Sequence, residues 1–216
     1  MNRRCIGIAG LLFILLGQRA AARGNPEGWV ELFNGRDLQG WHWKDPHGPK
    51  GWIVQDGVYV NHPPSTDIQT DQDYYNFQLH IEFNIAPGSN SGVYLRDKYE
   101  VQILDSYRKP ASVESCGALF GRIAPATDAA RQPGTWQTFD ITFVGRRLTV
   151  LQNGTRVLHN VDVGPKGTGR ASDCPDGPGP LRLQGDHGMV MFRNVRLRPL
   201  SATEAARMQQ EMEKER

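Results

Sequence analysis

Short hydrophobic runs and alternating hydrophobic and polar residues fill the chain from Trp29 to Leu200. Gly, Pro, Asn and Asp interrupt these runs every few residues, which is the pattern of short strands joined by tight turns. The pattern predicts strands over residues 53–60, 77–85, 92–96, 99–104, 118–122, 137–144, 147–151, 155–158, 181–184 and 189–197. No long amphipathic helix separates them, so we expect an all-β domain of two antiparallel sheets packed face to face, a sandwich or jelly roll.

Asn153-Gly154 lies between two alternating runs and gives the clearest local prediction. Both residues accept the positive φ angles of a type I′ turn, so a tight hairpin is expected there. Asn153-Gly154-Thr155 is also a glycosylation sequon, but the turn alone accounts for the Asn-Gly pair.

Two segments of the chain lie outside the predicted strands, one within the domain and one after it. Residues 162–180 are rich in Gly, Pro and Asp, and we expect a surface loop. Ser201 can cap the strong helix formers that follow it, so residues 201–216 are predicted to form a short C-terminal helix.

The first 22 residues have the organisation of a secretory signal peptide. Arg3-Arg4 precede an apolar run of 11 residues from Ile6 to Leu16, and Ala20 to Ala22 supply small residues for cleavage. A membrane-spanning helix needs about 20 apolar residues, and Cys5 precedes the run, where a lipid-anchored cysteine would follow it. The sequence therefore predicts a periplasmic or extracellular protein whose mature domain, residues 23–200, begins near Arg23.

Charge and motifs exclude several classes of function. The chain has 216 residues, with 25 Lys and Arg against 23 Asp and Glu, and removal of residues 1–22 leaves 22 basic residues against 23 acidic ones. A nearly neutral protein has no strong field for nucleic acid or an anionic membrane. Because there is no Gly-rich phosphate loop, CxxC pair or HExxH motif, we expect neither a nucleotide cofactor nor structural zinc.

Two cysteines remain in the mature chain, Cys116 and Cys174. An oxidising compartment favours a disulfide between them, and we predict that bond. Two separate buried thiols are the alternative, since a sequence does not give the Cα separation that a disulfide requires.

Polar residues of unusual chemistry alternate with the core residues of two neighbouring predicted strands. Val93, Leu95, Val101 and Ile103 would face the core. The opposite face would carry two amides, an arginine, a glutamate and a tyrosine, namely Asn90, Tyr94, Arg96, Glu100 and Gln102. A solvated outer surface is one interpretation, and a binding or catalytic face is the other.

Glu100 and Asp105 raise the question of paired carboxylates. They are five residues apart, so strict alternation puts them on opposite faces, whereas one β-bulge would return both to the same face. Glucanases of the lectin-like jelly-roll fold have a similar arrangement of acids on one strand. Here Gln102 replaces the middle acid, which weakens the prediction of a two-carboxylate glycosidase.

Further candidates lie near both ends of the domain. His187 follows Gln184 in a Gly-rich turn, where it could be a general base, a metal ligand or an ordinary loop residue. Of the tryptophans crowded at positions 29, 41, 43 and 52, we expect most to lie in the core and one, Trp41, to line a site by stacking on a sugar.

The order of motifs resembles the 3-keto-disaccharide hydrolase domain, a family once described as a domain of unknown function. The resemblance covers about residues 28–200 and is carried by residues 31–41, 90–96, 99–105, 136–138, 153–154 and 183–200. It implies a concanavalin A-like lectin/glucanase fold and a secreted bacterial protein that cleaves glycosides oxidised to a ketone at C3, in some members by elimination. The segment Val113-Glu114-Ser115-Cys116-Gly117 departs from the family pattern and puts the substrate preference in question.

That chemistry suggests roles for the candidates. A C3 ketone acidifies the C2 proton, so the enzyme needs a base and a group that stabilises the enolate. Glu100 or His187 could be the base, and Arg96, Gln102 or a divalent cation held by Glu100, Asp105 and His187 could stabilise the enolate. Asn90, Tyr94, Gln102, Gln184 and Trp41 would bind substrate, and a sugar 3-oxidoreductase would be a functional partner. A non-catalytic carbohydrate-binding module is the alternative from another class.

Secretion can be tested directly. We expect N-terminal sequencing of the exported protein to begin close to Arg23, because the small residues before it suit signal peptidase. Exported protein that retained Met1 would contradict this prediction.

Overall fold

The computed structural model describes residues 28–168 and 177–215 as a sandwich of two antiparallel sheets with one helix at the C-terminus. The predicted signal peptide and Cys174 lie outside the described residues. The strands are β1 Val30–Glu31, β2 Trp41–Trp43, β3 Trp52–Gln55, β4 Val58–Asn61, β5 Ile68–Tyr74, β6 Phe77–Ile85, β7 Asn90–Leu95, β8 Tyr99–Leu104, β9 Gln137–Val144, β10 Arg147–Gln152, β11 Thr155–Asp162, β12 Gly179–Leu183 and β13 Val190–Pro199.

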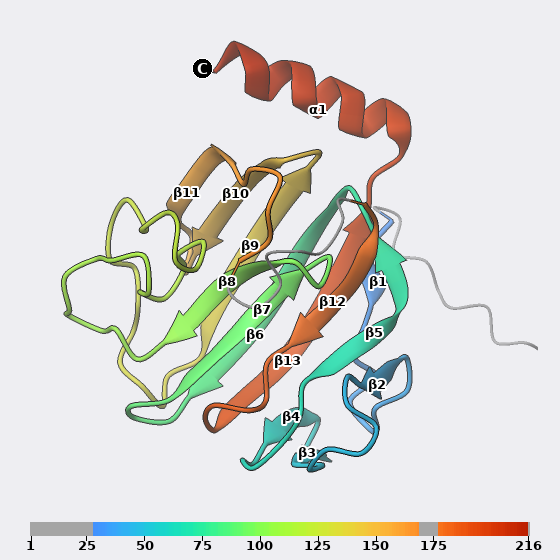
Figure 1. Cartoon of the computed structure of the whole chain (residues 1–216), viewed down its shortest axis with the longest axis vertical. Coiled ribbons are helices and arrows are strands. Elements are labelled where there is room, and N and C mark those ends of the chain that lie inside the picture. Colours follow the sequence, from blue (N-terminus) through green and yellow to red (C-terminus); the bar gives the residue numbers. More distant parts are fainter. Residues whose placement is uncertain (1–27, 169–176, 216) are drawn as a thin grey trace, which may run out of the picture.

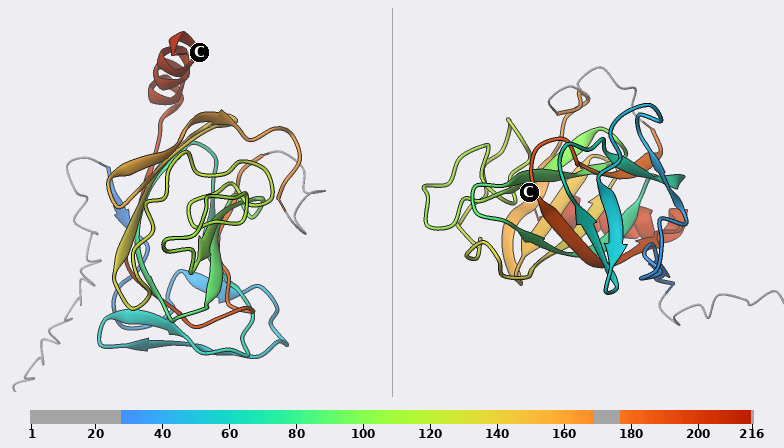
Figure 2. Two further views of the ribbon diagram at one scale, coloured as in Figure 1. Left: turned by 90° about the vertical axis from the view of Figure 1, so that its left-hand side faces the viewer. Right: turned by 90° about the horizontal axis from the view of Figure 1, so that it is seen from below.

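The two sheets form facing layers (Figures 1 and 2). The larger has the order β11-β10-β9-β6-β13-β4-β3, with β1 also paired to β13, and the smaller has the order β2-β5-β12-β7-β8. Most strands that pair within a sheet are distant in sequence. The smaller sheet therefore brings together side chains from β2, β5, β7, β8 and β12. The predicted all-β sandwich is confirmed.

The core lies between the sheets and follows the predicted alternation. Phe77, Leu79, Ile81 and Phe83 of β6 are at most 1% exposed. Across the core, the rings of Tyr99 in the smaller sheet and Phe143 in the larger meet edge to face, with centroids 5.5 Å apart. Core packing therefore fixes which face of β8 points outward, because Tyr99 must point inward.

Most predicted strands are present, and the exceptions have local causes. The predicted strand 53–60 is a hairpin, since Asp56 and Gly57 both have positive φ angles. The Asn153-Gly154 hairpin is confirmed, with φ angles of 53° and 79°. Residues 118–122 form no named strand, and only Leu119 makes isolated bridges.

The C-terminal helix α1, Ala202–Lys214, is also confirmed (Figure 1). Ser201 caps it in a capping box with Glu204. Ala205 packs with Val144 and Leu200 at the end of the sandwich. Within residues 28–168 and 177–215, no helix is long and apolar enough to cross a membrane.

Cys116 is buried, and its Sγ accepts a hydrogen bond of 3.2 Å from the side chain of Gln152. Burial raises the pKa of the thiol to about 12, so the thiolate is disfavoured. Because Cys174 is not among the described residues, the predicted disulfide stays a prediction.

Candidate functional site

One outward-facing side chain from each strand of the five-stranded sheet joins a continuous polar row. Strand pairing places His42 opposite Gln69, Gln69 opposite Arg182, Arg182 opposite Tyr94, and Tyr94 opposite Glu100. Neighbouring strands lie about 4.8 Å apart, so the row spans the full width of the sheet. The outer face of this sheet is therefore the candidate site.

Glu100 is the carboxylate of the row and is 2% exposed. It is hydrogen-bonded to the Tyr94 hydroxyl, and the amide nitrogen of Gln102 lies 3.1 Å from its Oε1 in the orientation that donates. Burial raises the pKa of Glu100 to about 7, although Tyr94, Arg182 and His187 act to lower it. A carboxyl group with this pKa is divided between its acid and base forms at neutral pH, which suits a general base.

Gly92 creates the space that Glu100 occupies. A Cβ atom at position 92 would lie 2.3 Å from Oε1 of Glu100 and 2.9 Å from its Cγ. These approaches are shorter than any van der Waals contact. Any other residue at position 92 would displace the carboxylate.

Arg182 organises the middle of the row. Its guanidinium lies 3.4 Å from the centre of the Tyr94 ring and forms ion pairs with Asp67 and Asp97. Burial opposes its charged form, but the two carboxylates outweigh burial and raise the pKa above its usual value. Asp97 also binds Lys44, with Nζ 2.7 Å from Oδ2. Tyr94 is thereby held against a permanent positive charge.

Several amide side chains on this face have unused hydrogen-bonding capacity. The side-chain oxygens of Gln69, Asn90 and Gln184 are buried and have no hydrogen-bond partner. Buried acceptors without donors are rare, because leaving one unpaired costs about 1–3 kcal/mol. The face is therefore prepared for a ligand that brings hydroxyl or N–H donors, and the predicted binding residues Asn90, Tyr94, Gln102 and Gln184 do lie together.

His187 stands in the exposed turn that follows β12, as predicted. Its Nδ1 is hydrogen-bonded to Asp186, and its side chain is 48% exposed. A carboxylate only accepts hydrogen bonds, so Nδ1 carries the proton and Nε2 is left for other partners. Its charge influences the pKa of Glu100, which places it within electrostatic range of that carboxylate.

Arg96 does not share this face, and that prediction is wrong. Strand β7 ends at Leu95, and Arg96 takes a positive φ of 56° in the turn before β8. Its guanidinium lies 3.9 Å from the ring centre of Phe143, a core residue of the opposite sheet, and its Nε donates to the Tyr75 carbonyl. The turn breaks the alternation on which the prediction depended.

Asp105 is also placed apart from Glu100. The pairing of β7 with β8 runs without a register shift from Leu95–Tyr99 to Asn90–Leu104, so the bulge that would bring the two acids together is absent from this pair. The Asp105 carboxylate instead accepts a hydrogen bond of 2.9 Å from the backbone of Gly88. It stabilises the turn before β7.

The prediction for Trp41 is wrong, and the residues considered as possible metal ligands do not meet. Trp41 is 6% exposed, and its indole donates to the Leu32 carbonyl at 2.6 Å on the core side of β2. It therefore offers no stacking surface. Among the described residues, no group of three His, Cys, Asp or Glu side chains could hold a metal ion, so Glu100, Asp105 and His187 do not fit that role together.

The sequence analysis did not identify several residues of the face, among them His42 and Gln69 of the row. Arg182 alternates with Leu181 and Leu183 in a predicted strand, so its outward direction was available from the pattern. Lys98 precedes Glu100 by two residues and is 2% exposed, and its Nζ has no hydrogen-bond partner. Asp67 had no signal, because the polar run of β5 was not recognised as a strand.

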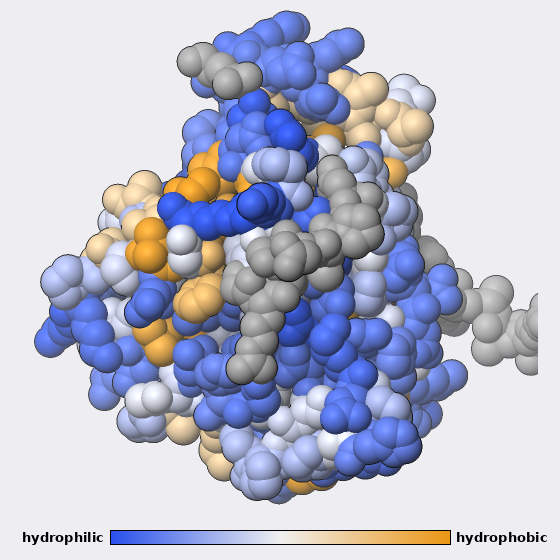
Figure 3. Space-filling view, in the orientation of Figure 1, coloured by the Kyte–Doolittle hydropathy of each residue, from blue (hydrophilic) through white to orange (hydrophobic). Residues whose placement is uncertain are grey.

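The surface around the site is polar. Figure 3 shows mostly hydrophilic residues on this side of the molecule, with hydrophobic residues gathered over the segment between β8 and β9. Val113 of that segment is 38% exposed. Recognition on this side therefore depends mainly on hydrogen bonds and charge.

The fold, together with the family and structural similarities that follow, defines a jelly-roll protein that acts on carbohydrate. A candidate glycosyl hydrolase from Parabacteroides distasonis is 30% identical, with a TM-score of 0.67 over 80% of this chain and 84% of its own. A second from the same organism is 26% identical, with a TM-score of 0.70 over 81% and 95%. The family GH16 endo-beta-1,3(4)-glucanase SCLam is 13% identical, with a TM-score of 0.50 over 80% and 91%, and shares the fold alone.

Residues 28–198 match the family of 3-keto-alpha-glucoside-1,2-lyase-like domains, and the chain belongs to that family. A comparison with curated proteins gave no match. The resemblance noted in the sequence and the concanavalin A-like fold that it implied are both confirmed.

The raised pKa of Glu100 predicts a pH-dependent loss of stability. Its folded pKa of about 7 lies above the ordinary value of 4.5, so the folded state holds this proton more tightly than the unfolded state. The stabilisation that comes from this proton is fully present below pH 4.5 and is lost as the pH rises through 7. Glu100→Gln changes the free energy of unfolding, and we expect that change to be about 3 kcal/mol more favourable at pH 8 than at pH 4. The figure follows because one pKa unit corresponds to about 1.4 kcal/mol.

Urea denaturation at both pH values measures this difference. Glu114→Gln removes an exposed carboxylate and is the matched control, for which no comparable pH-dependent gain is expected. Equal effects of Glu100→Gln at pH 4 and pH 8 would contradict the burial argument.

Proposed function

We propose that this protein is a secreted enzyme that cleaves 3-keto-glycosides, with Glu100 as the base that removes the C2 proton. The observation that carries the proposal is a buried carboxylate with a pKa of about 7 on a face of unpaired amide oxygens. Membership of the lyase-like family supports the substrate class. The alternative of a non-catalytic binding module has no use for a base of this kind.

The first step is proton abstraction. The Glu100 carboxylate takes the C2 hydrogen as a proton, and the electron pair moves toward C3 to give an enolate. The C3 carbonyl makes this possible, because the C2 proton of an unoxidised sugar is not acidic. Removal by a positioned base is worth about 100 to 10,000-fold.

The second step expels the aglycone. The enolate returns its electron pair to form a C1–C2 double bond, the C1–O bond breaks, and the leaving oxygen takes a proton. His187 is suited to supply that proton through Nε2, because Asp186 holds Nδ1. The product is a 3-keto-glycal, and addition of water across its double bond would give net hydrolysis.

Neutral and charged donors on the face would stabilise the enolate. Arg182 supplies a permanent positive charge beside Tyr94, and the Gln102 amide lies next to Glu100. A preorganised donor that contacts the enolate oxygen directly typically contributes about 3–4 kcal/mol, whereas the charge of Arg182, already paired with Asp67 and Asp97, contributes less. The oxygens of Asn90 and Gln184 would accept hydrogen bonds from sugar hydroxyls, which removes the cost of leaving them unpaired.

A two-carboxylate glycosidase is less well supported. That mechanism needs two carboxyl groups facing each other across the glycosidic bond. Asp105 is engaged with the turn at Gly88, and Asp67 is paired with Arg182. Neither is left as a partner for Glu100.

The substrate also implies a supplier. A 3-keto sugar is formed by oxidation of a secondary hydroxyl group, so we infer that a sugar 3-oxidoreductase acts before this enzyme. Both would be needed in the same compartment, which we propose is the periplasm or the cell exterior.

The activity can be tested with a chromogenic 3-keto-glucoside. We expect Glu100→Gln to lower kcat/KM by at least about 100-fold while the circular dichroism spectrum is unchanged, because the amide keeps the shape and loses the base. Glu114→Gln is the control and should keep full activity. Residual activity of Glu100→Gln within a few-fold of the parent, or faster cleavage of the unoxidised glucoside, would overturn the proposal.

A further inference from the structure

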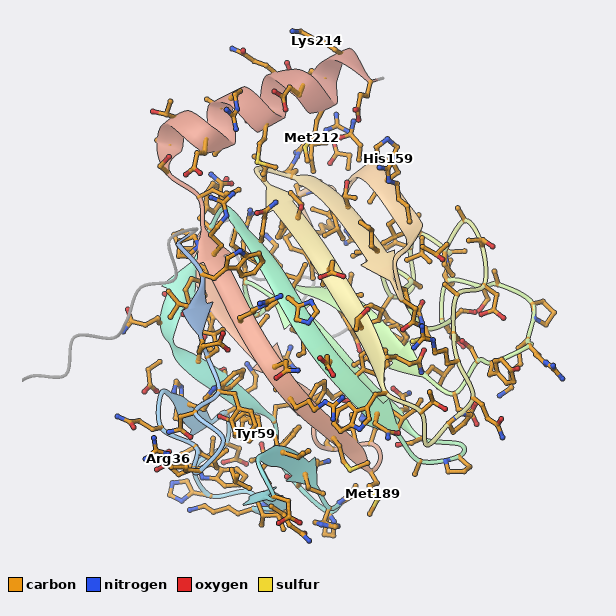
Figure 4. The ribbon with its side chains drawn as sticks, turned by 180° about the vertical axis from the view of Figure 1, so that it is seen from behind. Arg36, Tyr59, His159, Met189, Met212 and Lys214 are labelled. Atoms are coloured by element: carbon orange, nitrogen blue, oxygen red, sulfur yellow. The ribbon has the colours of Figure 1, made fainter. Side chains whose placement is uncertain are left out.

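A polar hollow lies on the opposite side of the molecule from the Glu100 face, on the outer face of the eight-stranded sheet. It has a volume of about 250 Å³ and is lined by Glu31, His80, Glu82, Asn194 and Arg196, from β1, β6 and β13. Figure 4 views this side, where β6, β9 and β13 are in front and polar side chains stand along them. The Glu100 face belongs to the other sheet, so the two places are separated by the core.

Hydrogen bonds hold the walls of the hollow in place. The Glu82 carboxylate accepts from Arg193 Nε at 2.7 Å and from the Asn194 amide. Burial raises the pKa of Glu82, but these hydrogen bonds outweigh burial and keep the pKa below its usual value. His80 Nδ1 is 2.6 Å from Asp140 Oδ1, which fixes its ring. The hollow is therefore preorganised.

Arg196 is the member whose hydrogen bonds are not satisfied. It is paired in register with His80 on one side and Glu31 on the other, and its guanidinium lies 5.3 Å from the ring centre of Trp29. Its Nε is buried without a hydrogen-bond partner. A planar guanidinium in this state offers parallel N–H groups that match two neighbouring oxygens of a ligand.

The charges around the hollow select the class of ligand. Glu31 and Glu82 would repel an anion, while Arg193 and Arg196 would repel a cation. A ligand with both donors and acceptors and no charge fits this mixture. The hollow is smaller than the roughly 300–1,000 Å³ pockets of drug-sized ligands, so it suits one sugar unit. Trp29 lies beside it, in contact with the Arg196 guanidinium, and can report on a ligand there.

From these observations we propose a second carbohydrate site, at Arg196 and Glu31, that binds one neutral hexose unit of a glycan and catalyses nothing. Its role is to hold a longer glycan or a glycan-rich surface while the Glu100 face acts. The proposal does not depend on the 3-keto chemistry and can fail or succeed separately from it.

The test follows the indole N–H resonance of Trp29 by NMR in ¹⁵N-labelled protein, assigned with Trp29→Phe, while cellotriose or maltotriose is added to millimolar concentration. We expect one of these neutral sugars to shift the resonance. Arg196→Gln should weaken that binding by at least tenfold, and Glu31→Gln, on an exposed edge strand, should weaken it several-fold without affecting the fold. Arg207→Gln, on the exposed face of α1, is the matched control.

The variant Glu100→Gln separates the two sites, since binding at Trp29 should be unchanged in it. The proposal is overturned if neither sugar shifts the Trp29 resonance, if folded Arg196→Gln and Glu31→Gln both bind as tightly as the parent, or if Glu100→Gln abolishes the shift. A shift caused by inorganic phosphate and by neither sugar would also overturn it, because the hollow would then be an anion site.

Discussion

The approach of the Glu100 carboxylate to the backbone of Gly92 is the contact on which the candidate site depends. Strand pairing sets Gly92 opposite Gln102 and Tyr94 opposite Glu100, so the missing side chain at position 92 leaves a gap between larger neighbours. Glu100 occupies that gap, where it loses water and gains hydrogen bonds from two neutral side chains. Burial without a directly bonded cation is what raises its pKa toward neutrality.

A second constraint keeps the positive charge of Arg182 near Glu100 without an ion pair between the two side chains. Arg182 is neutralised by Asp67 and Asp97, which come from the segment before β5 and from the turn between β7 and β8. Three segments distant in sequence are thereby joined at one guanidinium. Because that charge is already paired, it lowers the pKa of Glu100 less than burial raises it, and a base of useful strength results.

The sequence predicted those parts of the molecule that follow strict alternation. Strands β6, β8 and β9 have the predicted bounds, and the outward direction of Tyr94, Glu100 and Gln102 follows from the inward direction of their neighbours. Prediction failed where a turn or an irregular strand intervened. Arg96 lies one residue beyond the end of β7, and a left-handed backbone there turns its side chain into the core.

Other features depend on pairing between segments that are distant in sequence, and the local sequence pattern does not indicate them. The run Ile68-Gln69-Thr70-Asp71-Gln72-Asp73-Tyr74 is too polar to be recognised as a strand, although β2 and β12 pair with it on its two sides. Without β5 in place, the row from His42 to Glu100 could not be assembled, and Asp67 could not be assigned to Arg182. Trp41 was predicted to line the site, but its aromatic ring packs in the core from β2.

The account rests on removal of the C2 proton by Glu100, and the most direct measurement is the kinetic isotope effect on cleavage of a 3-keto-glucoside that carries deuterium at C2. Since the C2–H bond breaks in the first step, we expect kcat/KM to fall several-fold for the deuterated substrate and the label to be absent from a 3-keto-glycal product. Equal rates for the two substrates, with deuterium retained at C2 of the released sugar, would show that the glycosidic bond breaks without proton abstraction and would contradict the account.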